Sequence, residues 1–307
     1  MNMVWLAAPV SDAMHTWLNE QEYVVWNDTD MPANAHDIIG IITSNRLTLN
    51  RERLALLPNL RWIARMGSGM EIIDTVYCAE KGIACFSSPG GLSNSVAEHA
   101  MGMLLGLMHR IELASREVAS GLWIREANRG QELNGRCVGL IGYGHTGQAL
   151  AEKLRAFTPH VIAYDKYKTA FENPAAESVS LQELQARADI ISFHVPLNEE
   201  TRYYYNDDFM RAMAKPHMVM NTSRGPVCST KTILKGLAEK RITGACLDVL
   251  EEEAQIQTVL ETEQNVVQQL LQYPVIITPH IAGYSHQATE KMSAMLMAQI
   301  EAFNARR

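Results

Sequence analysis

The chain has 307 residues, of which 47% are hydrophobic, and its formal net charge is −7. One hydrophobic core rarely grows beyond about 250–300 residues, so this length favours two domains. The acidic balance without basic clusters argues against nucleic-acid binding, and the lack of any uninterrupted apolar run of about 18 residues argues against a membrane span.

The first part of the chain, residues 1–94, alternates short apolar runs with amphipathic stretches. This alternation is typical of α/β units with parallel strands, so we expect a small α/β domain here. The expected strands lie at residues 3–10, 23–27, 38–43, 60–66 and 83–88, and the expected helices at 11–21, 50–59 and 71–82.

A long helix is expected next, from about Ser95 to Gly121. Ser93 or Asn94 could cap its start, and Gly121 could end it. Its first half is apolar on almost every face, which predicts a helix buried on several sides. We therefore interpret residues 96–120 as a contact helix between domains or subunits.

From Cys137 onward, a second series of apolar runs predicts six more strands. They lie at residues 137–142, 161–165, 188–195, 217–223, 242–249 and 275–280, and one more helix follows at about 287–305. Six strands with helices between them are what a doubly wound dinucleotide-binding fold needs. We expect a Rossmann domain at 95–281, inserted into a smaller flavodoxin-like α/β substrate domain at 1–94 that is completed by 282–307.

The stretch VGLIGYGHTG contains Gly142, Gly144 and Gly147 in the spacing GxGxxG, after a strand and before a helix that includes QALAEKLRAF. In this context the first glycine permits a tight turn, the second lets the backbone approach a pyrophosphate, and the third lets the helix pack closely. Asp165 ends the next strand and would bind a ribose diol, which favours NAD over NADP. Lys166 and Lys168 leave some use of NADP open.

Three later strand ends carry polar side chains: Arg224 in NTSRG, Glu253 in LDVLEEE and His280 in TPHIAG. Ligands of open α/β sheets bind at the carboxyl ends of the strands. An arginine can hold a carboxylate, a histidine can transfer a proton to a carbonyl oxygen, and a glutamate can fix the imidazole tautomer. Each residue alone could be structural, but together with a nucleotide fold they predict carbonyl reduction.

The ordered motifs GYGHTG, NTSRG, GACLDVLEEE and TPHIAG resemble those of the D-isomer-specific 2-hydroxyacid dehydrogenases. The resemblance extends to RMGSGMEIID, SVAEHAMGMLLGL and HVPLNEETRY. It implies a catalytic triad of Arg224, Glu253 and His280, where spacing from the aspartate of LDV selects Glu253. It also implies cofactor contacts at His145, Thr146, Asp165, Val195, Pro196, Thr222 and Asp248, with Asp248 near the nicotinamide. His194 ends a strand beside this path and is expected to contact the cofactor as well.

The same resemblance implies that backbone N–H groups around Ser68 and Gly69 hold the substrate carboxylate. Within the family, the stretch 251–273 and VIAYDKYK are most similar to a subgroup labelled D-3-phosphoglycerate dehydrogenase, the first enzyme of serine synthesis. A phosphorylated substrate needs cations, and Arg65 and Arg46 are the candidates. The alternative substrates are hydroxypyruvate, glyoxylate or another small 2-keto acid.

Departures from the family pattern lie at Glu71-Ile72, Leu92 and Ala254, and the first two put the substrate in question. A chain that ends at Arg307 is expected to lack an appended regulatory domain. A non-catalytic NAD-sensing protein is the alternative of another class, because some relatives are transcriptional corepressors.

The family also implies a homodimer formed through residues 96–120. The N-terminal stretch MNMVWLAAPVSDAMH lacks a basic segment, so we expect no signal peptide. The five cysteines form no CxxC pair, which favours reduced thiols in a cytoplasmic protein. The histidines show no metal spacing, so no metal is expected.

Overall fold

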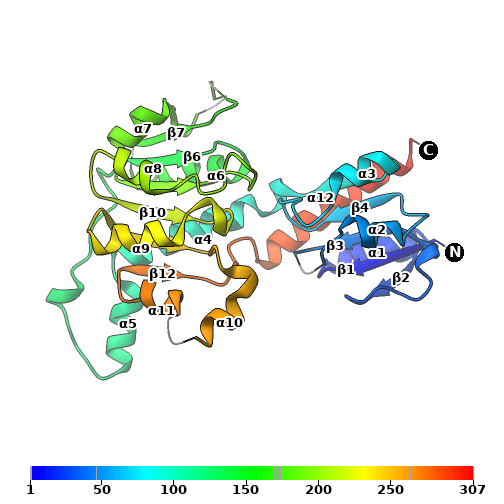
Figure 1. The fold of residues 1–307 in the computed structure, drawn as a ribbon, viewed down its shortest axis with the longest axis horizontal. Helices are drawn as coiled ribbons and strands as arrows, with labels where there is room; N and C mark the ends of the chain where they lie inside the picture. Colours follow the sequence, from blue (N-terminus) through cyan, green and yellow to red (C-terminus); the bar gives the residue numbers. More distant parts are fainter. Residues whose placement is uncertain are drawn as a thin grey trace. The chain divides into compact units, whose positions relative to one another are not determined.

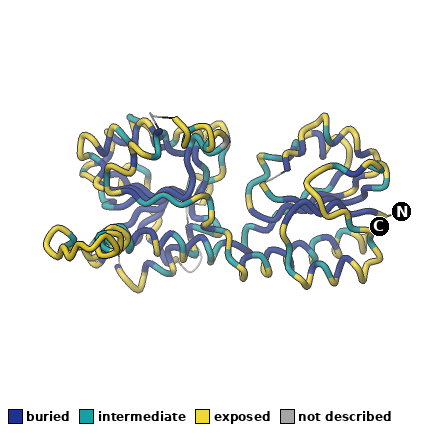
Figure 2. Tube along the Cα trace, turned by 90° about the horizontal axis from the view of Figure 1, so that it is seen from below, coloured by how far each residue is buried: buried dark blue, intermediate teal, exposed yellow. Residues whose placement is uncertain are grey.

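The computed structural model describes residues 2–45, 47–158, 160–168, 170–171, 174–262 and 265–306. Arg46, one of the two expected phosphate-binding arginines, lies outside these residues. The chain divides into two compact units, Met1–Ser95 with Gly283–Arg307 (unit 1) and Val96–Ala282 (unit 2) (Figure 1). Each unit is an α/β structure in which the central strands of the sheet are buried, as the dark blue segments in Figure 2 show.

Unit 1 is built on a parallel sheet. Its strands are β1 (Met3–Ala7), β2 (Val24–Asn27), β3 (Ile38–Thr43), β4 (Trp62–Arg65) and β5 (Ala84–Ser87). Among the described residues these five strands pair in the order β2-β1-β3-β4-β5. This is the flavodoxin-like order, so the expected fold of the smaller domain is confirmed.

Several helices of unit 1 begin after a residue whose side chain caps the first turn. The helices that lie wholly in unit 1 are η1 (Ala35–Asp37), α1 (Asp12–Glu20), α2 (Arg51–Ala55), α3 (Thr75–Lys81) and the C-terminal α12 (His286–Asn304). The side chains of Ser11, Asn50 and Asp74 each accept a hydrogen bond from the first turn of the helix that follows. Helix α12 packs on β4, β5 and α1, and Trp17 Nε1 donates to Glu301 Oε1 at 2.6 Å.

Unit 2 is built on a second parallel sheet. Its strands are β6 (Val138–Ile141), β7 (Val161–Tyr164), β8 (Glu177–Ser178), β9 (Ile190–Phe193), β10 (His217–Asn221), β11 (Ile242–Leu247) and β12 (Val275–Ile277). In the described part of the chain they pair in the order β12-β11-β10-β9-β6-β7-β8. This is the Rossmann order extended by one strand. All strand pairs are parallel, and the strand order reverses between β6 and β9, which is the topological switch point. The expectation of six strands was therefore one short, because β8 has only two residues, both exposed, and no apolar pattern.

Neighbouring residues of the central strands of unit 2 enter two different cores, one on each face of the sheet. Ile141, Ile191 and Val219 belong to one cluster, whereas Leu140, Ile190 and Met220 belong to the other. Side chains alternate across a strand, so strands buried on both faces are apolar without interruption. This explains why their positions could be predicted.

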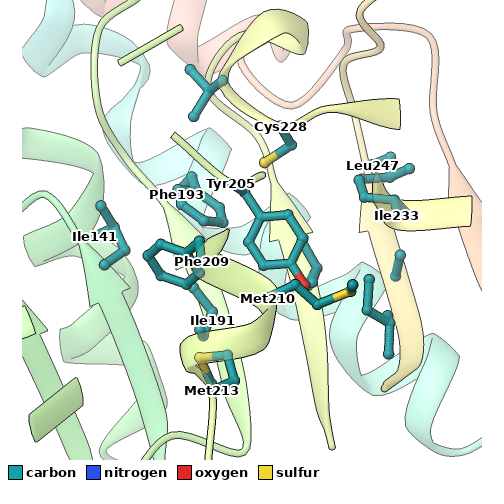
Figure 3. Packing of buried hydrophobic residues seen from close by; sticks show 14 of the residues in the cluster. Ile141, Ile191, Phe193, Tyr205, Phe209, Met210, Met213, Cys228, Ile233 and Leu247 are labelled. Atoms are coloured by element: carbon teal, nitrogen blue, oxygen red, sulfur yellow. The ribbon is translucent and has the colours of Figure 1, made fainter. Parts of the chain in front are cut away.

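Helices cover both faces of this sheet (Figure 1). They are α6 (His145–Leu154), α7 (Leu181–Arg187), α8 (Asp207–Ala212), α9 (Thr230–Ala238), α10 (Ile256–Leu260) and α11 (Val266–Leu270), with 3-10 turns η2 (Glu126–Asn128), η3 (Gly225–Val227) and η4 (Glu253–Gln255). Figure 3 shows the aromatic centre of one core, where Phe193, Tyr205 and Phe209 pack edge to face or tilted. The Tyr205 hydroxyl donates to Nε2 of the buried His217 at 2.8 Å.

The prediction of a single helix from Ser95 to Gly121 is wrong. The structure has α4 (Pro89–Met108) and a separate α5 (Ile111–Ala119), and the boundary between the units falls within α4. The helix starts six residues earlier than expected, because proline is well tolerated at the first helical position. It ends at Met108, whose carbonyl accepts from the backbone N–H of Gln131 at 2.9 Å, and Arg110 then adopts a positive φ of 54°.

Among the described residues, none of the helices is both long enough and apolar enough to cross a membrane.

Candidate active site

The glycine loop joins β6 to α6 and is packed closely against neighbouring backbone. Gly142 has φ +94°, and a Cβ atom there would lie 2.5 Å from the carbonyl oxygen of His194. A Cβ atom on Gly147 would lie 2.3 Å from the carbonyl oxygen of Gly142. These two glycines are therefore required for the turn and for the close packing of α6.

Gly144, by contrast, is not packed against other described residues. A Cβ atom at this position would meet no atom of the described chain within 4 Å, so the space beside it is open. Gly144 is also the N-cap of α6, and no described side chain caps the helix there. An open helix N-terminus offers N–H groups and a partial positive charge, which suits a pyrophosphate. His145 is exposed and Thr146 half-buried in the first turn of this helix.

Asp165 follows β7 and is fixed by backbone donors. Its Oδ2 accepts from the N–H of Tyr143 at 2.8 Å, and its Oδ1 accepts from the N–H groups of Tyr167 and Lys168 at 2.9 and 3.1 Å. The carboxylate is thus tied to the glycine loop itself. Each carboxylate oxygen has two acceptor sites, so capacity remains for a ribose hydroxyl.

The other expected cofactor residues follow β9 and β10. Val195 and Pro196 lie directly after β9. His194 is buried, its Nε2 lies 2.8 Å from Ser192 Oγ, and burial lowers its pKa to about 4, so its imidazole is neutral. Thr222 Oγ1 is buried and has no hydrogen-bond partner among the described residues. This hydroxyl and the open N-terminus of α6 fit a dinucleotide at the switch point between β6 and β9.

The structure brings two of the three expected catalytic residues into contact. His280 Nδ1 lies 2.5 Å from Glu253 Oε1, and the two side chains are 31% and 42% exposed. With Nδ1 donating to the carboxylate, Nε2 is the nitrogen that can exchange a proton with a substrate. Of the three adjacent glutamates, all described, only Glu253 contacts the imidazole; Glu251 binds Tyr203 and Thr230, and Glu252 binds Thr230.

Asp248 fixes the loop that carries His280. The carboxylate is 1% exposed and accepts from the N–H groups of Ile281 and Ala282, both at 2.9 Å, and from Thr278 Oγ1 at 2.6 Å. The N–H of His280 donates to the Asp248 carbonyl at 2.8 Å, and His280 has a positive φ of 56°. A left-handed backbone is uncommon for histidine, so the surrounding hydrogen bonds hold it there.

His99, from α4, extends this network. Its Nε2 lies 2.9 Å from Thr278 Oγ1 and 3.5 Å from Asp248 Oδ1. The single hydroxyl proton of Thr278 is donated to Asp248, so His99 must be the donor to the hydroxyl oxygen. Sequence reasoning left His99 and Thr278 without a role, because no local pattern links residues 179 positions apart.

Arg224 lies after β10, on a loop held by Asn221. Asn221 Oδ1 accepts from the N–H and hydroxyl of Ser223, and its Nδ2 donates to the Arg224 carbonyl at 2.9 Å. A Cβ atom on Gly225 would lie 1.8 Å from the carbonyl oxygen of Leu250. The glycine therefore allows the loop that carries Arg224 to lie against the segment that leads to Glu253.

The expected substrate residues of unit 1 lie on the loop after β4. Arg65 is 8% exposed, and its Nη1 donates to the Met66 carbonyl at 2.7 Å. Gly67 has φ +142°, and a Cβ there would lie 1.8 Å from Arg65 Nη1. Buried Ser88, which sequence reasoning missed, accepts from the N–H of Gly67 at 3.2 Å and donates to the Arg65 carbonyl at 3.3 Å.

Ser68 is exposed and Gly69 half-buried on this loop. No described residue accepts from the N–H of either, which leaves both donors available to an anion. A search of the described residues for three or more clustered metal-ligating side chains found none.

A Rossmann sheet with an open glycine loop, a carboxylate at the end of its second strand and a histidine–glutamate pair defines an NAD-dependent oxidoreductase. Residues 101–282 match the family model described as D-isomer specific 2-hydroxyacid dehydrogenase, NAD binding domain. The chain belongs to this family, and its cofactor is NAD, as the sequence predicted.

Similar proteins support the assignment. The chain is 35% identical to a hydroxypyruvate reductase of Thermotoga maritima over 79% of its own length and 77% of that protein. It is 32% identical to a D-3-phosphoglycerate dehydrogenase of Methanocaldococcus jannaschii, covering 86% of the chain but 49% of the relative. A D-lactate dehydrogenase from Aquifex aeolicus, complexed with NAD and lactic acid, superimposes with a TM-score of 0.84 at 26% identity, covering 99% and 96% of the two chains.

Proposed function

We propose that the protein reduces small 2-keto acids such as hydroxypyruvate and glyoxylate to the corresponding 2-hydroxy acids, with NADH as the hydride donor. The observation that carries this proposal is the 2.5 Å contact of His280 Nδ1 with Glu253 Oε1. A carboxylate at this nitrogen fixes the tautomer and the orientation of the ring, so Nε2 is the nitrogen positioned to exchange a proton with the substrate.

Each residue of the triad has a separate role in this proposal. His280 Nε2 gives its proton to the carbonyl oxygen during reduction and accepts the hydroxyl proton in the reverse direction. Arg224 binds the substrate carboxylate through its planar guanidinium. When bound, the nicotinamide supplies or accepts the hydride at C2 of the substrate. The free N–H groups of Ser68 and Gly69 are proposed to bind the substrate carboxylate.

The substrate proposal rests on the state of Arg65. A phosphate on the substrate needs an available cation, but the Arg65 guanidinium is buried and donates to the carbonyl of Met66 within its own loop. The hydroxypyruvate reductase relative also matches over most of its length, whereas the phosphoglycerate dehydrogenase relative matches over half. Both points favour a small acid.

D-3-phosphoglycerate remains the second candidate, together with a role in serine synthesis in the cytoplasm. It is supported by the same Arg65, whose Nη1 could exchange the Met66 carbonyl for a phosphate oxygen. A phosphate adds a charge–charge attraction to the guanidinium, and a second parallel hydrogen bond, which a single carbonyl oxygen does not offer. Arg65→Gln should then abolish most activity on the phosphorylated acid and leave glyoxylate reduction less affected.

The test is NADH consumption with hydroxypyruvate, glyoxylate and 3-phosphohydroxypyruvate under identical conditions. Higher kcat/KM for the two small acids is the expected result. A preference of more than about tenfold, or 1.4 kcal/mol, for the phosphorylated acid would establish the second candidate instead. His280→Ala should lower kcat by about 10²–10⁴-fold while NADH still binds, and near-normal turnover would remove His280 from its role.

We also propose that the protein forms a homodimer through residues 96–120 and the segment that follows. The apolar side chains of Ile111, Leu113 and Val118 on α5 are exposed, and so are those of Leu122, Trp123 and Ile124. Trp123 is 81% exposed, and contiguous exposed apolar side chains mark interaction surfaces. Sedimentation at monomer mass, unchanged by Trp123→Glu, would refute the dimer.

A further inference from the structure

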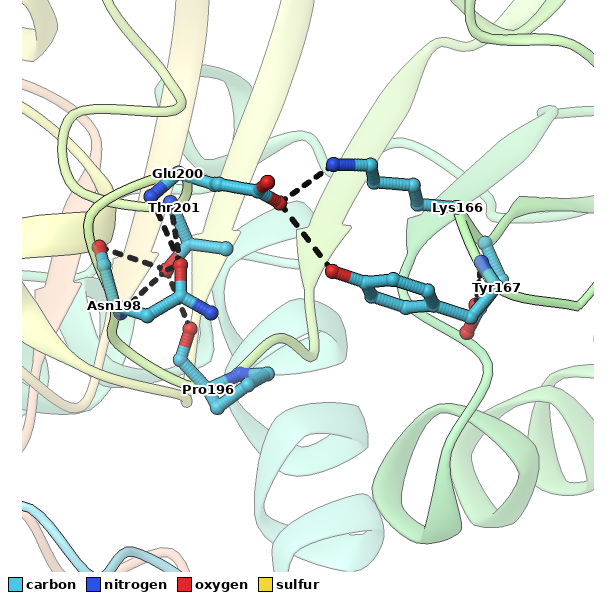
Figure 4. A network of polar contacts seen from close by, with 7 residues as sticks. Lys166, Tyr167, Pro196, Asn198, Glu200 and Thr201 are labelled. Carbon is cyan, nitrogen blue, oxygen red and sulfur yellow. Dashed lines mark hydrogen bonds and ion pairs between the residues drawn. The ribbon is translucent and has the colours of Figure 1, made fainter. Parts of the chain in front are cut away.

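An ion pair joins two loops at the carboxyl edge of the Rossmann sheet (Figure 4). Lys166 Nζ lies 2.7 Å from Glu200 Oε2, and the Tyr167 hydroxyl donates to the same oxygen at 3.3 Å. Lys166 and Tyr167 follow β7, whereas Glu200 belongs to the loop after β9. Because β6 lies between β7 and β9, the pair connects the loops on either side of the glycine loop.

Glu200 is held in place by its own loop. Asn198 Oδ1 accepts from the N–H groups of Glu200 and Thr201, both at 3.0 Å. Thr201 Oγ1 donates to the Pro196 carbonyl at 2.6 Å and accepts from the N–H of Asn198 at 2.8 Å. The backbone that carries the Glu200 carboxylate is therefore fixed on the side of β9, and Lys166 extends to it from the side of β7 (Figure 4).

The position matters because Lys166 is next to Asp165, the residue placed to bind the ribose diol. A 2′-phosphate on this ribose distinguishes NADP from NAD, and nearby cations accommodate it. Lys166 and Lys168 are two such cations by sequence. In the structure Lys166 is paired with Glu200, and Lys168 Nζ donates to the Tyr143 carbonyl at 3.1 Å.

Both members of the ion pair stay charged at neutral pH. The hydrogen bond with Glu200 raises the pKa of Lys166, and the same bond lowers the pKa of Glu200. The two carboxylates Asp165 and Glu200 thus balance the two lysines, and the site has no net positive charge to attract a phosphate.

We propose that Glu200 is a second determinant of NAD selectivity, which acts by holding Lys166 away from the 2′ position of the ribose. The proposal rests on the NAD site and is independent of which keto acid is reduced. Removal of the Glu200 charge releases Lys166, so a 2′-phosphate gains a cation and loses a repelling carboxylate.

Glu200→Gln is the test, with the adjacent exposed Glu199→Gln as a control for net charge. We would measure the kcat/KM values of NADH and NADPH with one keto acid, and the Kd of 2′,5′-ADP by calorimetry. Glu200→Gln should raise the NADPH/NADH ratio about fivefold and tighten 2′,5′-ADP to a similar degree, because one surface charge interaction changes. The gain should shrink at high salt, and it should be smaller in the double variant Glu200→Gln with Lys166→Ala, where only the loss of the repelling carboxylate remains.

An unchanged ratio and unchanged 2′,5′-ADP binding in Glu200→Gln would overturn the proposal. An equal gain in Glu199→Gln would also overturn it, since the effect would then reflect net charge alone. The binding measurement needs no turnover, so a failure of the proposed keto-acid substrates leaves this test intact.

Discussion

Substitution of Asp248 by asparagine tests whether the His280 loop depends on one buried carboxylate. The carboxylate accepts three hydrogen bonds from the loop, from Thr278 Oγ1 and the N–H groups of Ile281 and Ala282. An asparagine keeps one acceptor oxygen and places its NH₂ group against an N–H donor. At least one charged hydrogen bond is lost, at about 1.5–3 kcal/mol, and a buried donor is left without a partner.

The expected total loss of unfolding free energy for Asp248→Asn is about 3 kcal/mol. A domain of this size loses roughly 2–4 °C of Tm per kcal/mol, so Tm should fall by about 6–12 °C. Once released from its strained backbone, His280 should lose its alignment, and kcat should fall at least tenfold even at a temperature where the variant is folded. Thermal unfolding by circular dichroism and steady-state kinetics at 20 °C below Tm are the assays.

Asp189→Asn is the matched control. Asp189 accepts from the Cys137 N–H at 2.8 Å and from Lys215 Nζ at 2.7 Å, and it precedes β9 at the amino edge of the sheet. The Asp189→Asn substitution should therefore lower Tm while leaving kcat within about twofold of the wild-type value. The reasoning would be refuted if Asp248→Asn kept wild-type kcat, or if Asp189→Asn lost as much kcat as Asp248→Asn.

Three further predictions concern the same unit. Gly225→Ala places a Cβ against the Leu250 carbonyl, so we expect a loss of about 1–3 kcal/mol in denaturant unfolding together with a fall in kcat; wild-type values of both would contradict the close packing. Burial lowers the pKa of His217 from 6.5 to about 4, so the unfolded chain binds more protons between these values, and the free energy of unfolding should fall as pH drops from 6.5 towards 4. His217→Gln should flatten that slope in urea titrations, and an unchanged slope would exclude His217 as its cause. His99→Asn removes the donor to Thr278, so kcat should fall several-fold without a change in the Kd of NADH; weaker NADH binding alone would instead place His99 at the cofactor.

The central strands could be predicted from the sequence because burial on both faces makes them nearly continuous apolar runs. Strand β8 could not, since its two exposed residues are defined only by their pairing with β7. The start of α4 was also missed, because Pro89 is followed by two glycines that usually indicate a turn. In both cases the outcome depends on tertiary pairing and not on local residue preference.

In the candidate site, too, residues required by the local backbone could be predicted, and residues that act through tertiary contacts could not. Gly142 and Gly147 were predictable because the backbone path itself requires them. Ser88, Thr278 and His99 were not, because each acts through a partner that is distant in sequence and carries no motif of its own.

The choice of Glu253 over its neighbours now has a physical basis beyond its spacing from LDV. Glu251 accepts from the Tyr203 hydroxyl and the Thr230 N–H, and Glu252 accepts from the Thr230 hydroxyl. These bonds attach the first two carboxylates to the start of α9, and the third is the one that reaches His280. If this reasoning is correct, Glu251→Gln should preserve kcat, whereas Glu253→Gln should lower it, since a neutral amide orients the His280 imidazole less firmly than a carboxylate does. Equal losses of activity in the two variants would show that the three glutamates are interchangeable.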